Sequence, residues 1–258
     1  MPDRPALADS RHYAVRTIEF TQPLRWLALG WRDFLRCPVP GLLHGLALTL
    51  FGAVLLALAR DRFWFLAGAF SGFLLMAPIA ATGLYALSRA LERGERATLA
   101  VALRSWVPRD HRLVSFGVLL SLAGTGWVLT SASLITGFAD AAVRNPMDFI
   151  HYVVLSERSW LFEGWLALGG ALAAPVYASS VVAIPLLLDR RIGVMAAVLT
   201  SWRCVLANPV PLALWGALLI ALSGLGMITA VGLVIVAPWL AHASWHAYRD
   251  LVRPAQEG

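Results

Sequence analysis

The sequence predicts an all-α, polytopic membrane protein with six transmembrane helices. Hydrophobic residues make up 59% of its 258 residues and charged residues only 14%. This composition cannot give a soluble globule with a polar surface. A helix needs about 20 apolar residues to cross the hydrocarbon core of a bilayer. The uncharged runs that reach this length are Cys37 to Ala59, Phe63 to Ser88, Leu113 to Ala139, Gly164 to Leu188 and Val205 to Tyr248.

The last of these runs predicts two helices. A single helix from Val205 to Tyr248 would be roughly 66 Å long at 1.5 Å per residue, about twice the thickness of a membrane. The sequence SGLGM at Ser223 to Met227 contains two glycines, which favour a tight turn. We therefore expect the fifth helix to end there and the sixth helix to follow it.

Two or three amphipathic helices are predicted to lie on the membrane surface between the spans. Pro23 to Arg36 has apolar residues at helical spacing on one face and polar residues on the other. The apolar residues are Leu24, Leu27, Trp31 and Phe34, and the polar residues are Arg25, Arg32, Asp33 and Arg36. Two further segments have an apolar stripe at helical spacing. One stripe is Ile192, Met195, Leu199, Trp202 and Leu206, and the other, shorter one is Leu99, Leu103 and Trp106.

The arginines predict the orientation. All 21 basic residues are arginine, and 17 of them fall in the N-terminal segment, the loops after the second and fourth predicted helices, and the C-terminal tail. The positive-inside rule then places both termini in the cytoplasm. The absence of lysine suggests a GC-rich bacterial genome, and hence a bacterial inner membrane. The net charge of +6 indicates contact with anionic lipid headgroups and not with nucleic acid.

An internal repeat is predicted from two matches between the ends of the chain. Trp31 to Gly45 aligns with Trp202 to Gly216 at an offset of 171, and Ala77 to Arg89 aligns with Ala237 to Arg249 at an offset of 160. These matches predict parallel helical-hairpin units at about 22–92, 97–191 and 192–250 within one membrane domain, 22–250. Residues 1–21 would form a cytoplasmic arm and 251–258 a cytoplasmic tail.

His242 and His246 are the main candidate site residues. Their spacing of four residues places both imidazoles on one helical face, as in metal-binding pairs. His44, near the start of the first helix, is the best candidate for a third ligand. The histidines could bind haem, copper or zinc, could bind a proton or a substrate, or could be interfacial residues that bind nothing. Cys37 and Cys204 are expected to be free thiols.

Other chemistry is absent from the sequence. The predicted spans hold no Asp, Glu, Arg or Lys, so the buried carboxylate that many ion-coupled transporters use is missing. There is no phosphate-binding loop, nucleophile elbow or zinc-protease motif. We therefore expect a protein that is not an enzyme.

Four segments carry a resemblance to a known family. They are PLRWLALGWRDFLRCPVPGLLHGL, GLYALSRALERGERATLAVALRSW, VVAIPLLLDRRIGVMAAVLTSWRCVLANPVPLALW and LAHASWHAYRDLV. Together they resemble the bacterial integral-membrane domain-of-unknown-function family 2189 over most of residues 15 to 252. The resemblance implies an inner-membrane protein with no assigned activity. Some members carry the label cytochrome c oxidase subunit I, but only His44, His242 and His246 approach the membrane here, so no metal ligand is carried over.

The sequence thus favours a non-enzymatic scaffold, assembly factor or accessory subunit of a membrane complex, with a link to respiratory enzymes as one form of it. Its partners would be the lipid bilayer and other membrane proteins. The alternative is a small-molecule transporter or channel, suggested by the parallel repeats and the proline-containing helices. A haem- or metal-binding protein that uses His242, His246 and His44 is the third hypothesis.

Overall fold

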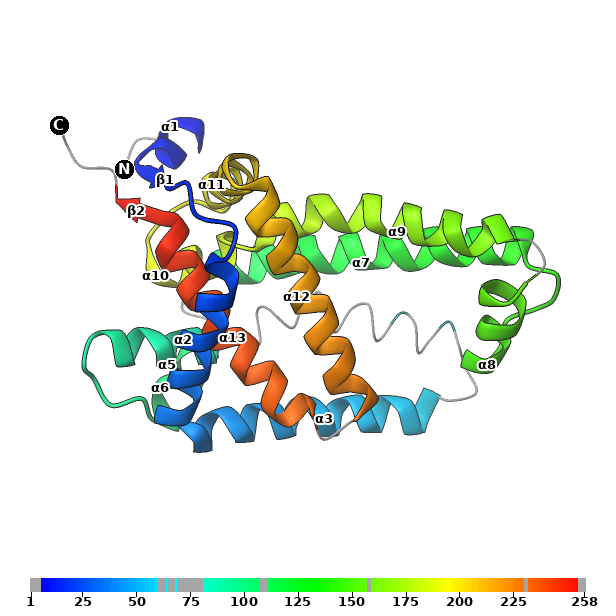
Figure 1. Ribbon diagram of the computed structural model, residues 1–258, viewed down its shortest axis with the longest axis horizontal. Coiled ribbons are helices and arrows are strands. Elements are labelled where there is room, and N and C mark those ends of the chain that lie inside the picture. Colours follow the sequence, from blue (N-terminus) through cyan, green and yellow to red (C-terminus); the bar gives the residue numbers. More distant parts are fainter. Residues whose placement is uncertain are drawn as a thin grey trace. The chain divides into compact units, whose positions relative to one another are not determined.

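The computed structural model describes residues 6–59, 64, 68, 81–106, 111–156, 159–229 and 232–254, which are mostly helical (Figure 1). The first half contains α1 Ala6–Arg11, β1 Tyr13–Val15, α2 Gln22–Arg36, α3 Pro38–Ala59, α5 Thr82–Glu92, α6 Leu99–Trp106 and α7 His111–Phe138. The second half contains α8 Pro146–Phe149, the π-helix η1 Ile150–Val154, α9 Ser159–Ser180, α10 Ala183–Asp189, α11 Val194–Ala207, α12 Pro209–Ile228, α13 Leu233–Leu251 and β2 Val252–Pro254.

The chain forms two compact units. The terminal unit comprises Met1–Thr49, Pro78–Phe116 and Tyr177–Gly258, and the hairpin unit comprises Leu50–Ala77 and Gly117–Val176. The terminal unit contains both chain ends, while the hairpin unit contains most of α7 and α9.

Four helical segments are long and apolar enough to cross a membrane. They are Pro38–Leu55, His111–Phe138, Trp160–Asp189 and Pro209–Ile228, and they match the first, third, fourth and fifth predicted spans. Most of the second predicted span, Phe63 to Ser88, lies outside the described residues. The sixth is helical as α13, but α13 is not among the four candidates, so six crossings remain a prediction.

The predicted break between the fifth and sixth helices is wrong by a few residues. α12 continues through SGLGM to Ile228, and the Thr229 hydroxyl then donates to the carbonyls of Leu225 and Gly226 and accepts from the Gly232 amide. A Cβ on Gly226 would lie 3.3 Å from the Val236 side chain. Gly226 therefore provides room for α13 beside α12.

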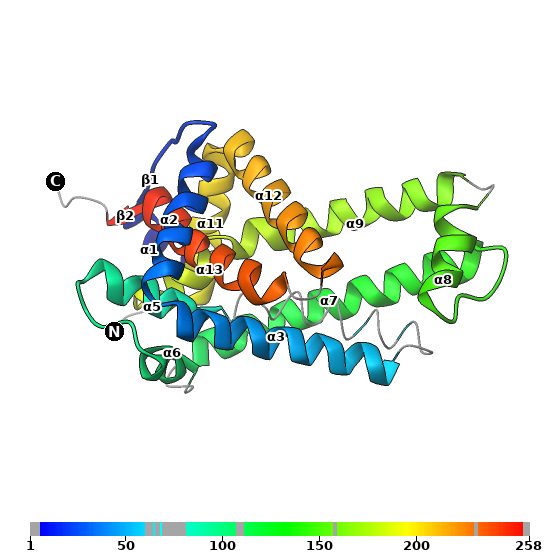
Figure 2. The same ribbon diagram turned by 60° about the horizontal axis from the view of Figure 1, so that its bottom comes forward.

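In the terminal unit, α2 packs lengthwise on α13, and the two helices lie side by side in both views (Figure 1, Figure 2). The indole of Trp239 donates to the Leu27 carbonyl at 2.7 Å. A Cβ on Gly30 would lie 2.5 Å from the backbone nitrogen of Ala243. The absence of a side chain at Gly30 is what lets the two backbones approach this closely.

This packing corrects the predicted faces of α2. Leu27 and Phe34 are buried, but Leu24 and Trp31 from the same predicted stripe are exposed. Asp33, placed on the polar face, is only 5% exposed. The buried face of α2 is therefore rotated from the predicted one, because its polar member Asp33 finds hydrogen-bond partners on other helices.

The predicted arm and tail are tied to each other in the structure. β1 pairs with β2 in antiparallel register, Tyr13 opposite Pro254 and Val15 opposite Val252. The Arg16 guanidinium donates to Asp250 at 3.2 Å. Both ends of the described chain therefore meet in the terminal unit.

α11 exposes only part of the apolar stripe that the sequence predicts for a surface helix, because Ile192, just before the helix, is buried and Leu199 is half-buried. Met195 and Leu206 are 60% and 71% exposed, while small residues such as Ala197 and Ser201 face the protein. The joint between α11 and α12 at Asn208 has φ −136° and ψ 54°, and the joint between α2 and α3 at Cys37 has φ −136° and ψ 61°. These joints correspond at the offset of 171; the duplication itself remains a prediction.

In the hairpin unit, α7 and α9 pack together, with Trp165 donating to the Ser131 hydroxyl at 2.6 Å. Asn145 begins α8 through a capping box with Asp148. The apolar core of this unit is formed by Ile135, Val143, Val153 and Leu161. α8 and η1 thus lie between the two long helices in the chain, and α8 begins at a capped residue.

The first prediction concerns the contact between α2 and α13. We expect Gly30→Ala to lower the thermal midpoint of the detergent-purified protein, because the added methyl meets the Ala243 backbone, and overpacking costs about 1–3 kcal/mol. Gly52→Ala is the matched control, since a Cβ there meets nothing within 4 Å. Equal midpoints for the two variants would contradict the packing.

Candidate functional site

The candidate functional site is a chain of buried polar side chains on α2, α5 and α13. Oδ2 of Asp33 accepts hydrogen bonds from the Ser88 hydroxyl at 2.8 Å and from Nε2 of His246 at 2.8 Å. The Ser88 oxygen also contacts Nδ1 of His242 at 2.7 Å. Asp33, Ser88, His242 and His246, which we name the Asp33 relay, therefore connect three helices through one carboxylate.

Each member of the relay is positioned by its helix. His242 and His246 are one turn apart on α13, as their spacing predicts, and the buried His242 is 0% exposed. Ser88 belongs to the buried face of α5. Asp33 follows Gly30 by three residues, so it lies next to the closest contact between α2 and α13.

The hydrogen-bond pattern determines the tautomer of His242. A hydroxyl has one proton, and Ser88 gives it to the Asp33 carboxylate. The contact between Ser88 and His242 must then use a proton on Nδ1 of His242, which the serine oxygen accepts. Nε2 of His242 is left with a lone pair, is buried, and has no hydrogen-bond partner among the residues that the structure describes.

The ionisation of Asp33 follows from its partners. Burial alone would raise the pKa of this carboxyl, but hydrogen bonds from His246 and Ser88 oppose burial and prevail, so the pKa of Asp33 lies below its ordinary value of 3.8. Asp33 is therefore a carboxylate at neutral pH. The relay places this negative charge beside two imidazoles.

His44, the third histidine singled out from the sequence, lies on α3. It is 5% exposed, and its Nδ1 contacts the Pro40 carbonyl at 3.0 Å. The structure thus brings all three predicted histidines into the terminal unit, with His242 and His246 joined through Ser88 and Asp33.

The described residues contain no group of three or more His, Cys, Asp or Glu side chains placed to hold a metal ion. Nε2 of His246 is already bonded to Asp33. A zinc site uses three or four protein ligands. The metal role of His242, His246 and His44 remains an untested prediction. Cys37 and Cys204 are buried, unbridged thiols.

Sequence reasoning missed Asp33 and Ser88. A signal for Asp33 was present, because Trp26, Gly30 and Asp33 recur at spacings of four and three and so share a helical face. A glycine and a tryptophan on that face indicate close packing rather than solvent. Ser88 carries no such signal, since serine occurs as readily on exposed faces.

The fold defines a class: a multi-pass helical membrane protein with a polar relay between helices. The model of the family described as "Predicted integral membrane protein (DUF2189)" matches residues 65–189, which confirms the expected resemblance over that part of the chain. The matched region is shorter than the expected 15 to 252; it includes Ser88 but neither Asp33 nor the two relay histidines. Searches of curated proteins and of solved structures gave no match.

The second prediction concerns the pH dependence of stability. Asp33→Asn should lower the free energy of unfolding at neutral pH by about 1.5–3 kcal/mol, the contribution of hydrogen bonds to a charged group. Because the pKa of Asp33 is lowered by folding, this stabilisation is complete above the ordinary value of 3.8 and is lost as the pH falls further. Thermal midpoints of both proteins, measured from neutral pH to about pH 3, should therefore converge in acid.

The control for this experiment is Asp140→Asn, which removes an exposed carboxylate of the hairpin unit. It should leave the midpoint nearly unchanged at every pH. A gap between native protein and Asp33→Asn that stays constant or widens in acid would contradict the ionised, hydrogen-bonded Asp33.

Proposed function

We propose that this protein is a non-enzymatic scaffold or accessory subunit of a membrane complex. The observation that carries the proposal is the apolar character of the candidate spans. α3, α7 and α12 contain no acidic residue, and the acidic residues of the fourth candidate span, Glu163 and Asp189, lie near its two ends. Charged residues within spans commonly mark the pathways of ions and substrates. Such helices are suited to contact with lipid and with other helices.

The hydroxyl groups on these helices support the same interpretation. Thr49 on α3 donates to the carbonyl four residues earlier in its own helix, and Ser121, Thr125 and Thr130 on α7 do the same. A hydroxyl bonded in this way offers little to a passing solute. Several polar side chains of the terminal unit are bonded to one another, as in the Asp33 relay, which suits a fixed support.

α12 offers a surface for a partner helix. Ile220 and Ile228 are 77% and 84% exposed. In a bilayer such side chains contact either lipid tails or the apolar face of another transmembrane helix. The proposed partner is therefore another integral membrane protein, whose identity the proposal leaves to experiment.

The third prediction tests this role by site-specific crosslinking in native membranes. A photoreactive residue at Ile220 or Ile228 should give a discrete adduct with one other membrane protein. The same residue at the buried Leu212 should give none. Adducts with lipid or with the protein itself alone would contradict the proposal, as would solute flux in proteoliposomes above that of empty vesicles.

We further propose a bacterial inner membrane with both termini in the cytoplasm. The pairing of β1 with β2 supports placing both ends on one side, because strands cannot pair across a bilayer. The excess of arginine in the terminal segments and in alternate loops supports the cytoplasmic side.

The fourth prediction follows from this orientation. Reporter proteins that are active only in the cytoplasm should be active when fused to either the N-terminus or the C-terminus. The same reporter inserted in the segment between α7 and α8 should be inactive. Opposite results at the two termini would contradict the orientation and also the strand pairing.

A further inference from the structure

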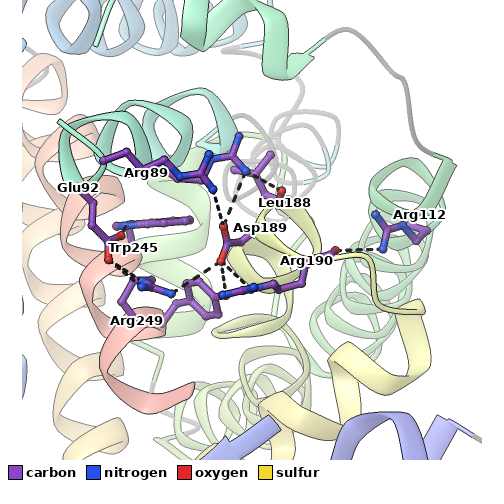
Figure 3. A network of polar contacts seen from close by, with 10 residues as sticks. Arg89, Glu92, Arg112, Leu188, Asp189, Arg190, Trp245 and Arg249 are labelled. Carbon is purple, nitrogen blue, oxygen red and sulfur yellow. Dashed lines mark hydrogen bonds and ion pairs between the residues drawn. The ribbon is translucent and has the colours of Figure 1, made fainter. Parts of the chain in front are cut away.

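Several arginines converge on one buried carboxylate in the terminal unit, apart from the Asp33 relay (Figure 3). Asp189, at the end of α10, has a side chain that is only 5% exposed. The arginine nitrogens within 4.0 Å of it belong to Arg89, Arg93, Arg190 and Arg249. We name these four residues the arginine cluster. They come from α5 and the residue after it, from the residue after α10, and from α13.

Asp189 cannot bond all of these guanidinium groups. Its Oδ2 accepts from the Tyr248 hydroxyl at 2.8 Å and lies 3.2 Å from Nε of Arg190. Arg89, Arg93 and Arg249 are 3.9, 4.0 and 3.9 Å away. Those distances exceed the 2.7–3.2 Å of an N–H···O hydrogen bond. Three guanidinium groups are therefore held near the carboxylate without being bonded to it.

Acceptors other than Asp189 form hydrogen bonds with only some of the guanidinium groups in the cluster. Arg249 donates from Nε to Glu92 at 2.9 Å, and Arg89 donates to the Leu188 carbonyl at 3.1 Å. The guanidinium group of Arg93 makes no hydrogen bond to the described residues, and the Arg93 side chain is 56% exposed. Since two carboxylates face four guanidinium groups, an excess of positive charge remains, together with free N–H donors.

The cluster lies at the ends of two candidate spans. Asp189 is the last residue of the candidate span Trp160–Asp189, and the candidate span His111–Phe138 begins near it. Arg112, in the first turn of that second span, donates to the carbonyl of Arg190 (Figure 3). It also donates to the carbonyl of Ile192. In a bilayer that both spans cross, the guanidinium groups of Arg93 and Arg190 would lie near the level of the lipid phosphate groups.

Arginines that only set the orientation of a membrane protein point into water and need no common partner. These four are instead gathered around Asp189. Arg89 and Arg249, which correspond at the sequence offset of 160, approach different oxygens of Asp189 at the same distance of 3.9 Å. Asp189 therefore acts as a central support that holds like charges close together. A bound anion would relieve their mutual repulsion.

We propose that the arginine cluster binds the phosphate group of an anionic lipid headgroup. A guanidinium group presents a planar fork of donors that matches two phosphate oxygens. Arg93 and Arg190, the more exposed members at 56% and 41%, would make the direct contacts. Arg89 and Arg249, which are less exposed, would attract the phosphate through their positive charge. A soluble phosphate monoester has the same chemistry, and the experiment below separates the two sources. The inference is independent of the scaffold proposal.

The fifth prediction tests this site on the full-length protein in mild detergent. Native mass spectrometry should show saturable binding of short-chain phosphatidylglycerol and weaker binding of phosphatidylcholine, which carries no net charge. Arg93→Gln with Arg190→Gln should weaken phosphatidylglycerol binding about tenfold, the effect of losing one charged hydrogen bond. Arg25→Gln with Arg32→Gln, which removes the same charge from exposed positions on α2, is the matched control and should change binding less than about twofold.

Two further arms complete the experiment. The variant Arg93→Lys with Arg190→Lys retains the charge but loses the planar fork of guanidinium donors, so its affinity for phosphatidylglycerol should lie between those of the native protein and the glutamine variant. If the glutamine variant does not fold, the lysine variant tests the site in its place. Glycerol 3-phosphate that binds as tightly as the lipid, and is lost in the same variants, would support the site with a soluble ligand. Equal losses in the cluster and control variants, or no saturable binding of either ligand, would overturn the proposal.

Discussion

The carboxylate of Asp33 is the constraint on which the terminal unit depends. A buried charge without partners destabilises a protein by several kcal/mol, so α2 can bury Asp33 only where donors are available. Ser88 on α5 and His246 on α13 provide them, and both bond to the same oxygen. The positions of three helices are thereby coupled. Gly30 completes the arrangement, because a larger residue would hold α2 away from the α13 backbone.

The composition and the lengths of the uncharged runs were sufficient to predict the long apolar helices. They were insufficient for α2, where apolar residues occur on more than one face and Asp33 is indistinguishable by type from a solvated acid. Its burial depends on Ser88 and His246, which are 55 and 213 residues away in the chain. Local periodicity does not contain that information. The pairing of β1 with β2 was also missed, because strands of three residues have no measurable alternation.

The histidines show a different limit of sequence reasoning. Their spacing correctly predicted a shared face on α13 but not what that face meets. One of the alternatives left open for His242 was an interfacial residue that binds nothing, but the residue is 0% exposed and Ser88 of α5 contacts its Nδ1. The spacing along α13 did not predict this contact, because Ser88 is 154 residues away in the chain.

Asp33 and Asp189 are both buried carboxylates, but they differ in how their charge is balanced by nearby groups. Asp33 is matched to its donors, so the relay is complete apart from one nitrogen of His242. Asp189 has more cations around it than it can bond. The first arrangement stabilises the unit by itself, whereas the second is completed by an anion. This difference is why a structural role is assigned to the first and a binding role to the second.

The central claim is that Asp33 and His246 hold α2 against α13, and a double-mutant cycle measures it most directly. The free energy of unfolding would be determined for the native protein, Asp33→Asn, His246→Ala and the double variant. Residues in direct contact show coupling energies of about 0.5–3 kcal/mol. We predict a value in the upper half of that range because the acceptor, Asp33, is buried and charged. A coupling energy near zero would contradict the account.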